Sequence, residues 1–395
     1  MTSGRVRVRI TPLFSVTGYA TPVSELTISS SAVSYNQDLS MASETLAISA
    51  IQAALDECVA AGAPGVIIVI DAPPLGIAFS GASGLFAKGN SRPLRPDDPF
   101  RAASVTKAVT AATAVRLAAE GRWDLDSPIT PFLPPNLVVL LRGLEGLENV
   151  EALTIRRLLN HTSGLPDYFF RDRFQARVQG DPNRMWHPVE LVEAAIEENR
   201  LAFLPGTDFS YGDTGYVLVG LAIERLVDRP LADAYRSLIF DPLQMNATYL
   251  EWHEPPRSSA VSHHYDGQRD LLSMNTSFDW AGGGLVTTAD DLVKFLRGLF
   301  GGALFDQRWL TELTTWRDGL RWPPDSSARY LRYGLGMGVN PACGEEIIGA
   351  TGVWGAFAYF WPAGGAAIAG TVNLRGADRS TLLDAVVCAL RSVKR

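Results

Sequence analysis

Strand-like segments near both ends of the chain, with a long helical stretch between them, constrain the fold more than any other feature. Gly65–Ile70 is a β-branched run followed by a proline-rich turn, which is typical of a buried strand, and a second strand is expected within Gly76–Phe86. Four more strand patterns follow near the C-terminus: Tyr333–Val339, Glu345–Gly349, Ala356–Trp361 and Ala366–Asn373. Short strands that are adjacent in sequence can pair antiparallel. The pattern therefore predicts β-rich ends that flank a mostly helical middle.

Apolar residues at helical spacing predict the helices. One helix is expected over Glu44–Ala61, a second over the alanine-rich Ser104–Ala119, and a last one over Arg379–Val393. Further short helical patterns are Val189–Glu198, Tyr216–Leu226, Leu231–Phe240 and Ala289–Leu299. We expect an N-terminal extension, residues 1–42, followed by one domain, residues 43–395. The domain has a sheet-and-helix part, residues 43–123 and 282–395. A mostly helical part, residues 124–281, interrupts it.

Charge and cysteine content exclude several classes of protein. The 395 residues have a formal net charge of −7, and the basic residues are scattered, so no nucleic-acid partner is expected. No apolar run reaches the length of a membrane span and no leader pattern is visible, so we expect a cytoplasmic protein with no membrane partner. Cys58, Cys343 and Cys388 lie far apart in sequence. Their spacing argues against a disulfide framework or a zinc site, and we expect reduced thiols and no cofactor or metal.

The strongest local signal is Ser104-Val-Thr-Lys107, an S-x-x-K motif at the start of the alanine-rich helix. Residues three apart share a helix face, so the lysine amine can approach the serine hydroxyl. A serine needs a neighbouring base to become a nucleophile, and a helix N-terminus suits a developing oxyanion. The chain has 35 basic residues, of which only four are lysines. A lysine can lose its proton near neutral pH, whereas an arginine cannot. A lysine at position 107 therefore stands out in a chain that uses arginine at nearly every other basic position.

Two other segments complete a candidate site. Tyr211-Gly-Asp213 offers a tyrosine that could exchange protons with the nucleophile or the leaving group. Gly349-Ala-Thr-Gly352-Val-Trp-Gly355 enters a strand, and its glycines allow the backbone to approach a ligand closely. Taken alone, each of these is a plain loop feature.

Together, the three segments resemble the active-site motifs of class C β-lactamases, in order and in spacing. Leu158–Pro166, Asp241–Met245, Gly282–Asp290 and Tyr333–Met337 resemble further segments of the same superfamily, which includes D,D-peptidases, D-aminopeptidases and family VIII esterase-like serine hydrolases. The resemblance spans residues 45–393. It implies a β-lactamase/transpeptidase-like α/β (α+β) fold, in which an antiparallel sheet is flanked by helices and joined to an all-helical region.

The resemblance also implies roles for individual residues. Ser104 would be the nucleophile, Lys107, Tyr211 or the pair would remove its proton, and the N–H groups of Ser104 and Val353 would hold the oxyanion. Asp213, Ala350, Gly352, Val353, Trp354 and His161 are the candidate substrate-binding residues. For His161, a hydrogen bond within its own loop is the more economical interpretation, and His253, His263 and His264 lack the spacing of a metal site.

Two departures from the family pattern bear on the substrate. Asp213 occupies a position where the family usually has Asn, and a carboxylate favours a protonated Lys107. Ala350 occupies the place of a Lys or His that helps to hold a substrate carboxylate. We therefore expect a serine hydrolase that acts on small-molecule esters or amides through an acyl-enzyme, rather than a β-lactamase. An acyltransferase of secondary metabolism and a non-catalytic penicillin-binding-like protein are the alternatives, and the sequence leaves the oligomeric state open.

Overall fold

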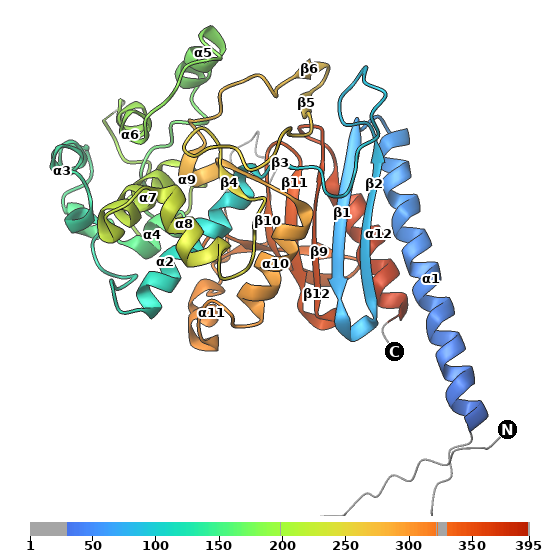
Figure 1. The fold of residues 1–395 in the computed structure, drawn as a ribbon. Coiled ribbons are helices and arrows are strands. Elements are labelled where there is room, and N and C mark those ends of the chain that lie inside the picture. The colour runs from blue at the N-terminus through green and yellow to red at the C-terminus, as the bar shows by residue number, and fades with distance from the viewer. Residues whose placement is uncertain (1–29, 198, 321, 323–329, 394–395) are drawn as a thin grey trace, which may run out of the picture.

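One seven-stranded antiparallel sheet joins the two ends of the chain. The computed structural model describes residues 30–197, 199–320, 322 and 330–393, with side chains from residue 42 onward. The strand order is β2-β1-β12-β11-β10-β9-β8 (Figure 1). The strands are β1 (Gly65–Ala72), β2 (Ile77–Gly84), β8 (Arg332–Tyr333), β9 (Gly338–Ala342), β10 (Glu345–Thr351), β11 (Ala356–Trp361) and β12 (Ala366–Val372). The N-terminal strand β1 pairs with the C-terminal strand β12 over six residue pairs.

Helices cover both faces of this sheet. On one face, α1 (Ser30–Ala60) and α12 (Arg379–Val393) pack against each other and the strands, while α10 (Ala289–Phe300) covers the other face at β1, β11 and β12. Both faces of β1 are buried in this way, because Ile68 faces α1 and α12 whereas Ile67 belongs to the core on the opposite side. A strand buried on both faces has a continuous apolar run rather than an alternating one. Among the described residues, no helix has the length and apolar character needed to cross a membrane.

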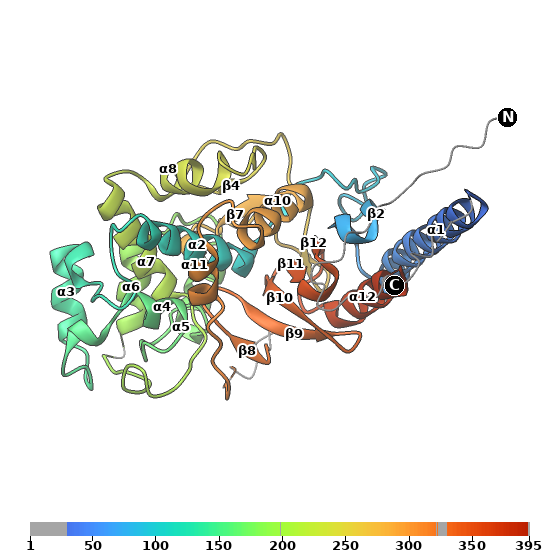
Figure 2. The same cartoon turned by 90° about the horizontal axis from the view of Figure 1, so that it is seen from below.

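The helical region lies beside the sheet, on the side away from α1 and α12 (Figure 2). Its central helix is α2 (Thr106–Ala119), which a short 3-10 turn, η2 (Ala103–Val105), precedes. The other helices are α3 (Pro135–Arg142), α4 (Ile155–Leu159), α5 (Asp172–Gly180), α6 (Pro188–Ile196), α7 (Thr214–Val227), α8 (Leu231–Tyr235), α9 (Trp280–Gly283) and α11 (Gln307–Leu313). Short strands form two small sheets: β3 (Phe100–Arg101), β7 (Leu285–Thr287) and β4 (Tyr249–Leu250), and separately β5 (Tyr265–Asp266) with β6 (Arg269–Asp270). The expected architecture, an antiparallel sheet flanked by helices and joined to a helical region, is confirmed.

One expected strand is wrong in detail. The single strand expected over Tyr333–Val339 is divided into β8 and β9 by a turn, because Gly336 has a φ of +76° and passes so close to α2 that a Cβ would lie 2.5 Å from the carbonyl oxygen of Lys107. The helical segment expected over Leu231–Phe240 is confirmed, with α8 followed by a π-helical turn, Arg236–Phe240. Helix α1 begins at Ser30, within the expected extension, and residues 1–29 lie outside the described residues.

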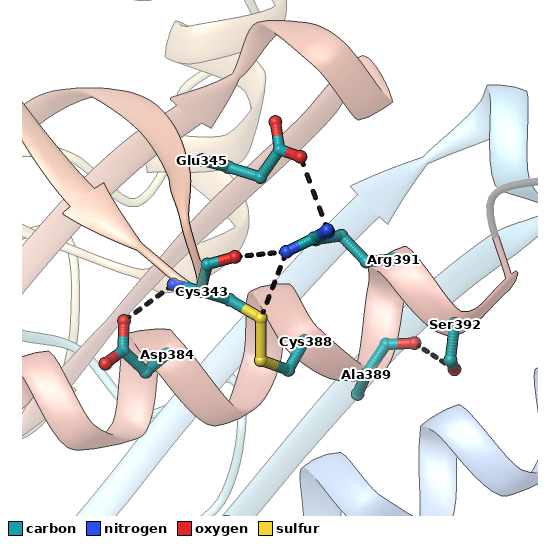
Figure 3. The surroundings of a disulfide bond; sticks show 7 residues. All are labelled: Cys343, Glu345, Asp384, Cys388, Ala389, Arg391 and Ser392. Atoms are coloured by element: carbon teal, nitrogen blue, oxygen red, sulfur yellow. Dashed lines mark hydrogen bonds and ion pairs between the residues drawn. A yellow bond between two sulfur atoms is a disulfide. The ribbon is translucent and has the colours of Figure 1, made fainter.

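The expectation of reduced thiols is also wrong for two of the three cysteines. Cys343, in the turn between β9 and β10, forms a disulfide with Cys388 of α12 (Figure 3). The two cysteines lie far apart in sequence, which argued against a disulfide. In the fold, the β9–β10 turn lies next to α12, so the Cα atoms of Cys343 and Cys388 are 5.4 Å apart. Cys58 remains a free, half-buried thiol on α1.

Candidate active site

Ser104 lies in a sharp turn between β3 and α2. Ala103, immediately before it, has a φ of +45°, a backbone conformation that costs an alanine energy. Gly352, from a distant segment, makes room for this turn, because a Cβ there would lie 2.3 Å from the carbonyl oxygen of Ala102. Gly283, from a second distant segment, lies next to the same turn, and a Cβ there would be 3.5 Å from the carbonyl carbon of Ala103. The position of Ser104 thus depends on a strained backbone turn, and distant parts of the chain pack around that turn.

Lys107 is fully buried one turn further along, and three acceptors surround its ammonium group. Its Nζ donates to Ser104 Oγ at 3.1 Å and to the carbonyl oxygen of Gly282 at 2.9 Å, and it forms an ion pair with Asp213. A lysine ammonium has three N–H donors, so every one of them has a partner here. In this state Lys107 has no lone pair with which to accept the Ser104 proton.

The surroundings of Lys107 hold it in the charged form. Burial alone would lower the pKa of Lys107, but the negative charge of Asp213, the Tyr211 hydroxyl and the hydrogen bond from Lys107 to Asp213 together raise it above the ordinary value. An asparagine at position 213 would accept a hydrogen bond without supplying this charge. Asp213 therefore decides the protonation state of Lys107.

Tyr211 is the second group that contacts Ser104. Its hydroxyl interacts with the Ser104 side chain, and Lys107 Nζ lies 5.1 Å from the centre of its ring. Burial raises the pKa of Tyr211 to about 12, while the charge of Lys107 opposes that rise and the charge of Asp213 adds to it. Proton movements at Lys107 and Tyr211 are consequently linked.

His161 lies behind Tyr211. Its ring centre is 4.4 Å from that of Tyr211 and 4.9 Å from that of Tyr333, and its Nδ1 accepts the backbone N–H of Gly212 at 3.4 Å. Burial, followed by the charge of Lys107, lowers its pKa well below the usual value, so the imidazole is neutral. This position supports a packing role beneath the Tyr211 loop.

The third segment reaches Ser104 from the sheet. Ala350 is buried within β10, one residue before the strand ends. The turn after this strand contains Gly352, Val353 and Trp354. Trp354 is only 4% exposed, and its indole N–H donates to Asp279 at 3.2 Å. The indole therefore forms part of the packed wall of the site rather than an open face.

Two carboxylates next to the site, the partly buried Asp167 and the buried Asp279, were missed in the sequence. Asp167 accepts the backbone N–H groups of Asp213 and Thr214, the latter at 3.0 Å, and so fixes the start of α7. Burial raises its pKa to about 6, with the charge of Asp213 as the second cause. Burial and then Asp213 likewise raise the pKa of Asp279 to about 7. Both residues adjoin matched segments, Asp167 directly after Leu158–Pro166 and Asp279 shortly before Gly282, but only their long-range contacts reveal their place.

The order of the segments around Ser104 is that of a known family. The family model described as Beta-lactamase matches residues 51–391. The chain belongs to the beta-lactamase family. Within the part of the chain that the structure describes, no group of three or more His, Cys, Asp or Glu side chains is arranged to hold a metal ion.

Similar proteins include esterases and amidases. Esterase EstB of Burkholderia gladioli is 34% identical over 210 residues, which cover 51% of each chain. The match thus spans about half the length of this curated relative, and the same is true of Protein Rv1367c of Mycobacterium tuberculosis, at 31% identity and 57% of its length. Among solved structures, a D-stereospecific amidohydrolase from Streptomyces sp. matches with a TM-score of 0.74 and 30% identity, over 86% of this chain and 98% of that one. D-amino acid amidase from Ochrobactrum anthropi SV3 matches with a TM-score of 0.75 and 27% identity, over 88% and 99%.

Proposed function

We propose that this chain is a serine hydrolase that cleaves esters or amides of small molecules through an acyl-enzyme formed on Ser104. The observation that carries the proposal is that two proton-transfer groups surround one hydroxyl: Lys107 Nζ lies 3.1 Å from Ser104 Oγ, and the buried Tyr211 hydroxyl interacts with the same side chain. An activated serine needs such partners. The names of EstB and of the D-amino acid amidase support ester and amide substrates.

Acylation begins with the attack of Ser104 Oγ on the substrate carbonyl carbon. The Ser104 proton passes to the linked pair of Lys107 and Tyr211, with Tyr211 as the main acceptor because all three N–H donors of Lys107 are occupied. Tyr211 accepts this proton as a phenolate, which forms beforehand when Tyr211 releases its own proton to solvent and which the charge of Lys107 stabilises. The N–H groups of Ser104 and Val353 hold the oxyanion, and Tyr211 returns the proton to the leaving group.

The acyl-enzyme is then resolved by water. Tyr211 removes a proton from the water, the water oxygen attacks the acyl carbon, and the Ser104 Oγ–acyl bond breaks as Oγ regains a proton. If an alcohol or amine replaces water at this step, the same machinery makes a new ester or amide. Product analysis with added alcohols or amines separates the two outcomes, since hydrolysis alone leaves only the free acid.

The substrate is neutral or apolar on its acyl side. Ala350 is buried at the position where the family's third motif usually supplies a cation, and it has no group to pair with a substrate carboxylate. We therefore expect a matched pair of esters, one neutral and one with a carboxylate near the acyl group, to favour the neutral ester.

The deciding experiment measures hydrolysis of a short-chain p-nitrophenyl ester by the wild type, Ser104→Ala and Lys107→Ala. We expect both variants to lose turnover, and mass spectrometry to find the acyl adduct only on protein that retains Ser104. Near-normal turnover by either variant would contradict this arrangement. Absence of both turnover and adduct in the wild type would favour a non-catalytic protein that has kept the fold.

A further inference from the structure

Two segments from distant parts of the sequence enclose the turn before Ser104. One contains Gly283 at the end of α9, and the other contains Gly352 after β10. A Cβ on Gly352 would lie 2.9 Å from the Cβ of Ala103, so this segment touches the alanine whose φ is +45°. Such a conformation persists only where the surrounding structure over-determines it.

A single hydrogen bond between side chains connects the two segments. The indole N–H of Trp354, two residues after Gly352, donates to Asp279 Oδ2 at 3.2 Å. Both residues are buried, with exposed fractions of 4% and 6%. A hydrogen bond to a buried carboxylate is stronger than one between neutral groups, and its loss leaves that carboxylate with an unmet acceptor.

Each end of this bond is also tied to a group in the proposed mechanism. The backbone carbonyl of Asp279 accepts the N–H groups of Gly282 and Gly283 at 2.8 and 2.7 Å, which closes the turn whose Gly282 carbonyl accepts from Lys107. On the other side, Trp354 follows Val353 in a turn that is closed by the N–H of Gly355 donating to the carbonyl of Gly352 at 3.0 Å. The Trp354–Asp279 bond thus joins the segment that contacts Lys107 to the segment that carries the proposed oxyanion N–H of Val353.

We propose that Asp279 and Trp354 are positioning residues whose hydrogen bond clamps these two segments around the Ala103–Ser104 turn. The proposal rests on the proposed function, in which Ser104 is the nucleophile and the Val353 N–H faces the oxyanion. With the clamp closed, Ala103 is kept in its left-handed conformation and Ser104 Oγ stays between Lys107 and Tyr211. With it open, Ala103 relaxes and the hydroxyl moves away from both.

The expected signature is a loss of kcat with little change in KM. A small acyl group makes few contacts that depend on the exact position of Ser104 Oγ, whereas the chemical step depends on it steeply, since a misplacement of 1 Å can cost about 100-fold in rate. Trp354→Phe keeps most of the ring volume and removes only the N–H donor. We expect its acylation rate on a short p-nitrophenyl ester to fall on the order of 10- to 100-fold.

Trp361→Phe is the matched control. Trp361 is also a fully buried tryptophan, and its indole N–H also donates to a carboxylate, Glu345 Oε2 at 3.3 Å, but it lies at the far end of β11. Its loss should lower stability without lowering kcat. If both variants lose kcat in proportion to their loss of thermal stability, Trp354 has only a general structural role and the proposal fails.

Rescue by Ala103→Gly is the decisive measurement. Glycine adopts positive φ without steric cost, so the turn no longer needs the clamp to hold it. We expect Ala103→Gly/Trp354→Phe to recover a large part of the kcat that Trp354→Phe loses. Asp279→Asn, whose amide oxygen can still accept from the indole, should lose less kcat than Asp279→Ala. A Trp354→Phe variant with wild-type kcat, or one that Ala103→Gly leaves unrescued, would overturn the clamp.

Ser104→Ala in the same series keeps the two proposals apart. Its loss of turnover, together with normal kcat in Trp354→Phe, would reject the clamp and leave the hydrolase intact. Turnover that persists in Ser104→Ala would reject the hydrolase mechanism, and the clamp with it.

Discussion

Asp213 is the residue that most separates this site from the usual family pattern. Its carboxylate is buried against the Lys107 ammonium, and its charge raises the pKa values of both Lys107 and Tyr211. One substitution relative to the usual asparagine therefore shifts both candidate bases in the same direction. For the proposed hydrolase, we therefore expect activity at higher pH than the same site would have with asparagine at position 213.

Asp213→Asn should move the acidic limb of the pH profile of kcat/KM to lower pH. An opposite charge at contact distance typically shifts a pKa by about 1 to 3 units, and the limb should move by a comparable amount. The measurement is hydrolysis of a neutral p-nitrophenyl ester across pH 5 to 10. Asp290→Asn is the control, because Asp290 is exposed and pairs with Lys294 at the surface. An unchanged limb in Asp213→Asn would mean that Asp213 does not set the ionisation of the base.

At the scale of elements, the site depends on how α7 begins. Asp167 accepts the backbone N–H groups of Asp213 and Thr214, and also the Thr214 hydroxyl at 3.3 Å, so one carboxylate fixes the turn that presents Tyr211. Burial is the main reason why its pKa rises to about 6. A carboxyl with a raised pKa in the folded state holds its proton there more tightly than in the unfolded chain.

Asp167 should therefore make the protein less stable as the pH rises from about 4 through 6. The folded state binds more protons than the unfolded state in this window, so the unfolding free energy falls with increasing pH, on the order of 2 kcal/mol from this group. Asp167→Asn removes the titration and should flatten that part of the curve, as measured by urea unfolding between pH 4.5 and 7.5. Asp126→Asn is the control: its hydrogen bond to Arg156 lowers the Asp126 pKa from 3.8, so this carboxyl titrates below the measured range and its removal should leave the slope unchanged. A curve for Asp167→Asn that runs parallel to the wild-type curve would contradict a raised pKa for this carboxyl.

Elements with a strong local pattern could be predicted, and those shaped by distant contacts could not. The bounds of β11 and α12 agree with the sequence expectation, since a compact aromatic run and a regular apolar spacing define them locally. The break between β8 and β9 depends on how closely Gly336 approaches α2, and no local pattern encodes that distance. The same holds for the site. Ser104-Val-Thr-Lys107 can be recognised in the sequence as a motif, but the place of Asp279 at the site is revealed only by its contact with Trp354.

At the scale of the whole molecule, the C-terminal helix is fastened to the sheet that leads to Ser104. The Cys343–Cys388 bond joins the β9–β10 turn to α12, and Cys343 N also donates to Asp384 at 2.8 Å (Figure 3). Beyond this hairpin, the buried Arg379 at the start of α12 donates to the carbonyl of Gly352 at 3.1 Å. The same helix thus holds both ends of β10. The disulfide bears on the expected cytoplasmic location as well, since such bonds persist mainly in oxidising compartments.

Removing the disulfide should lower stability and leave the chemistry intact. The two cysteines are 45 residues apart in sequence, and closing a loop of that length in the unfolded chain is worth about 4 kcal/mol in the chain-entropy model. Cys343→Ala/Cys388→Ala should therefore lose up to that amount in denaturant unfolding, while kcat at 25 °C stays near wild type because the Arg379 contact with Gly352 remains. Cys58→Ala, which removes the free thiol, should change neither quantity. Counting free thiols on protein isolated under alkylating conditions shows whether the disulfide forms in the cell. One free thiol is expected if it does. Three free thiols would place the protein in a reducing compartment, where non-covalent contacts alone hold α12.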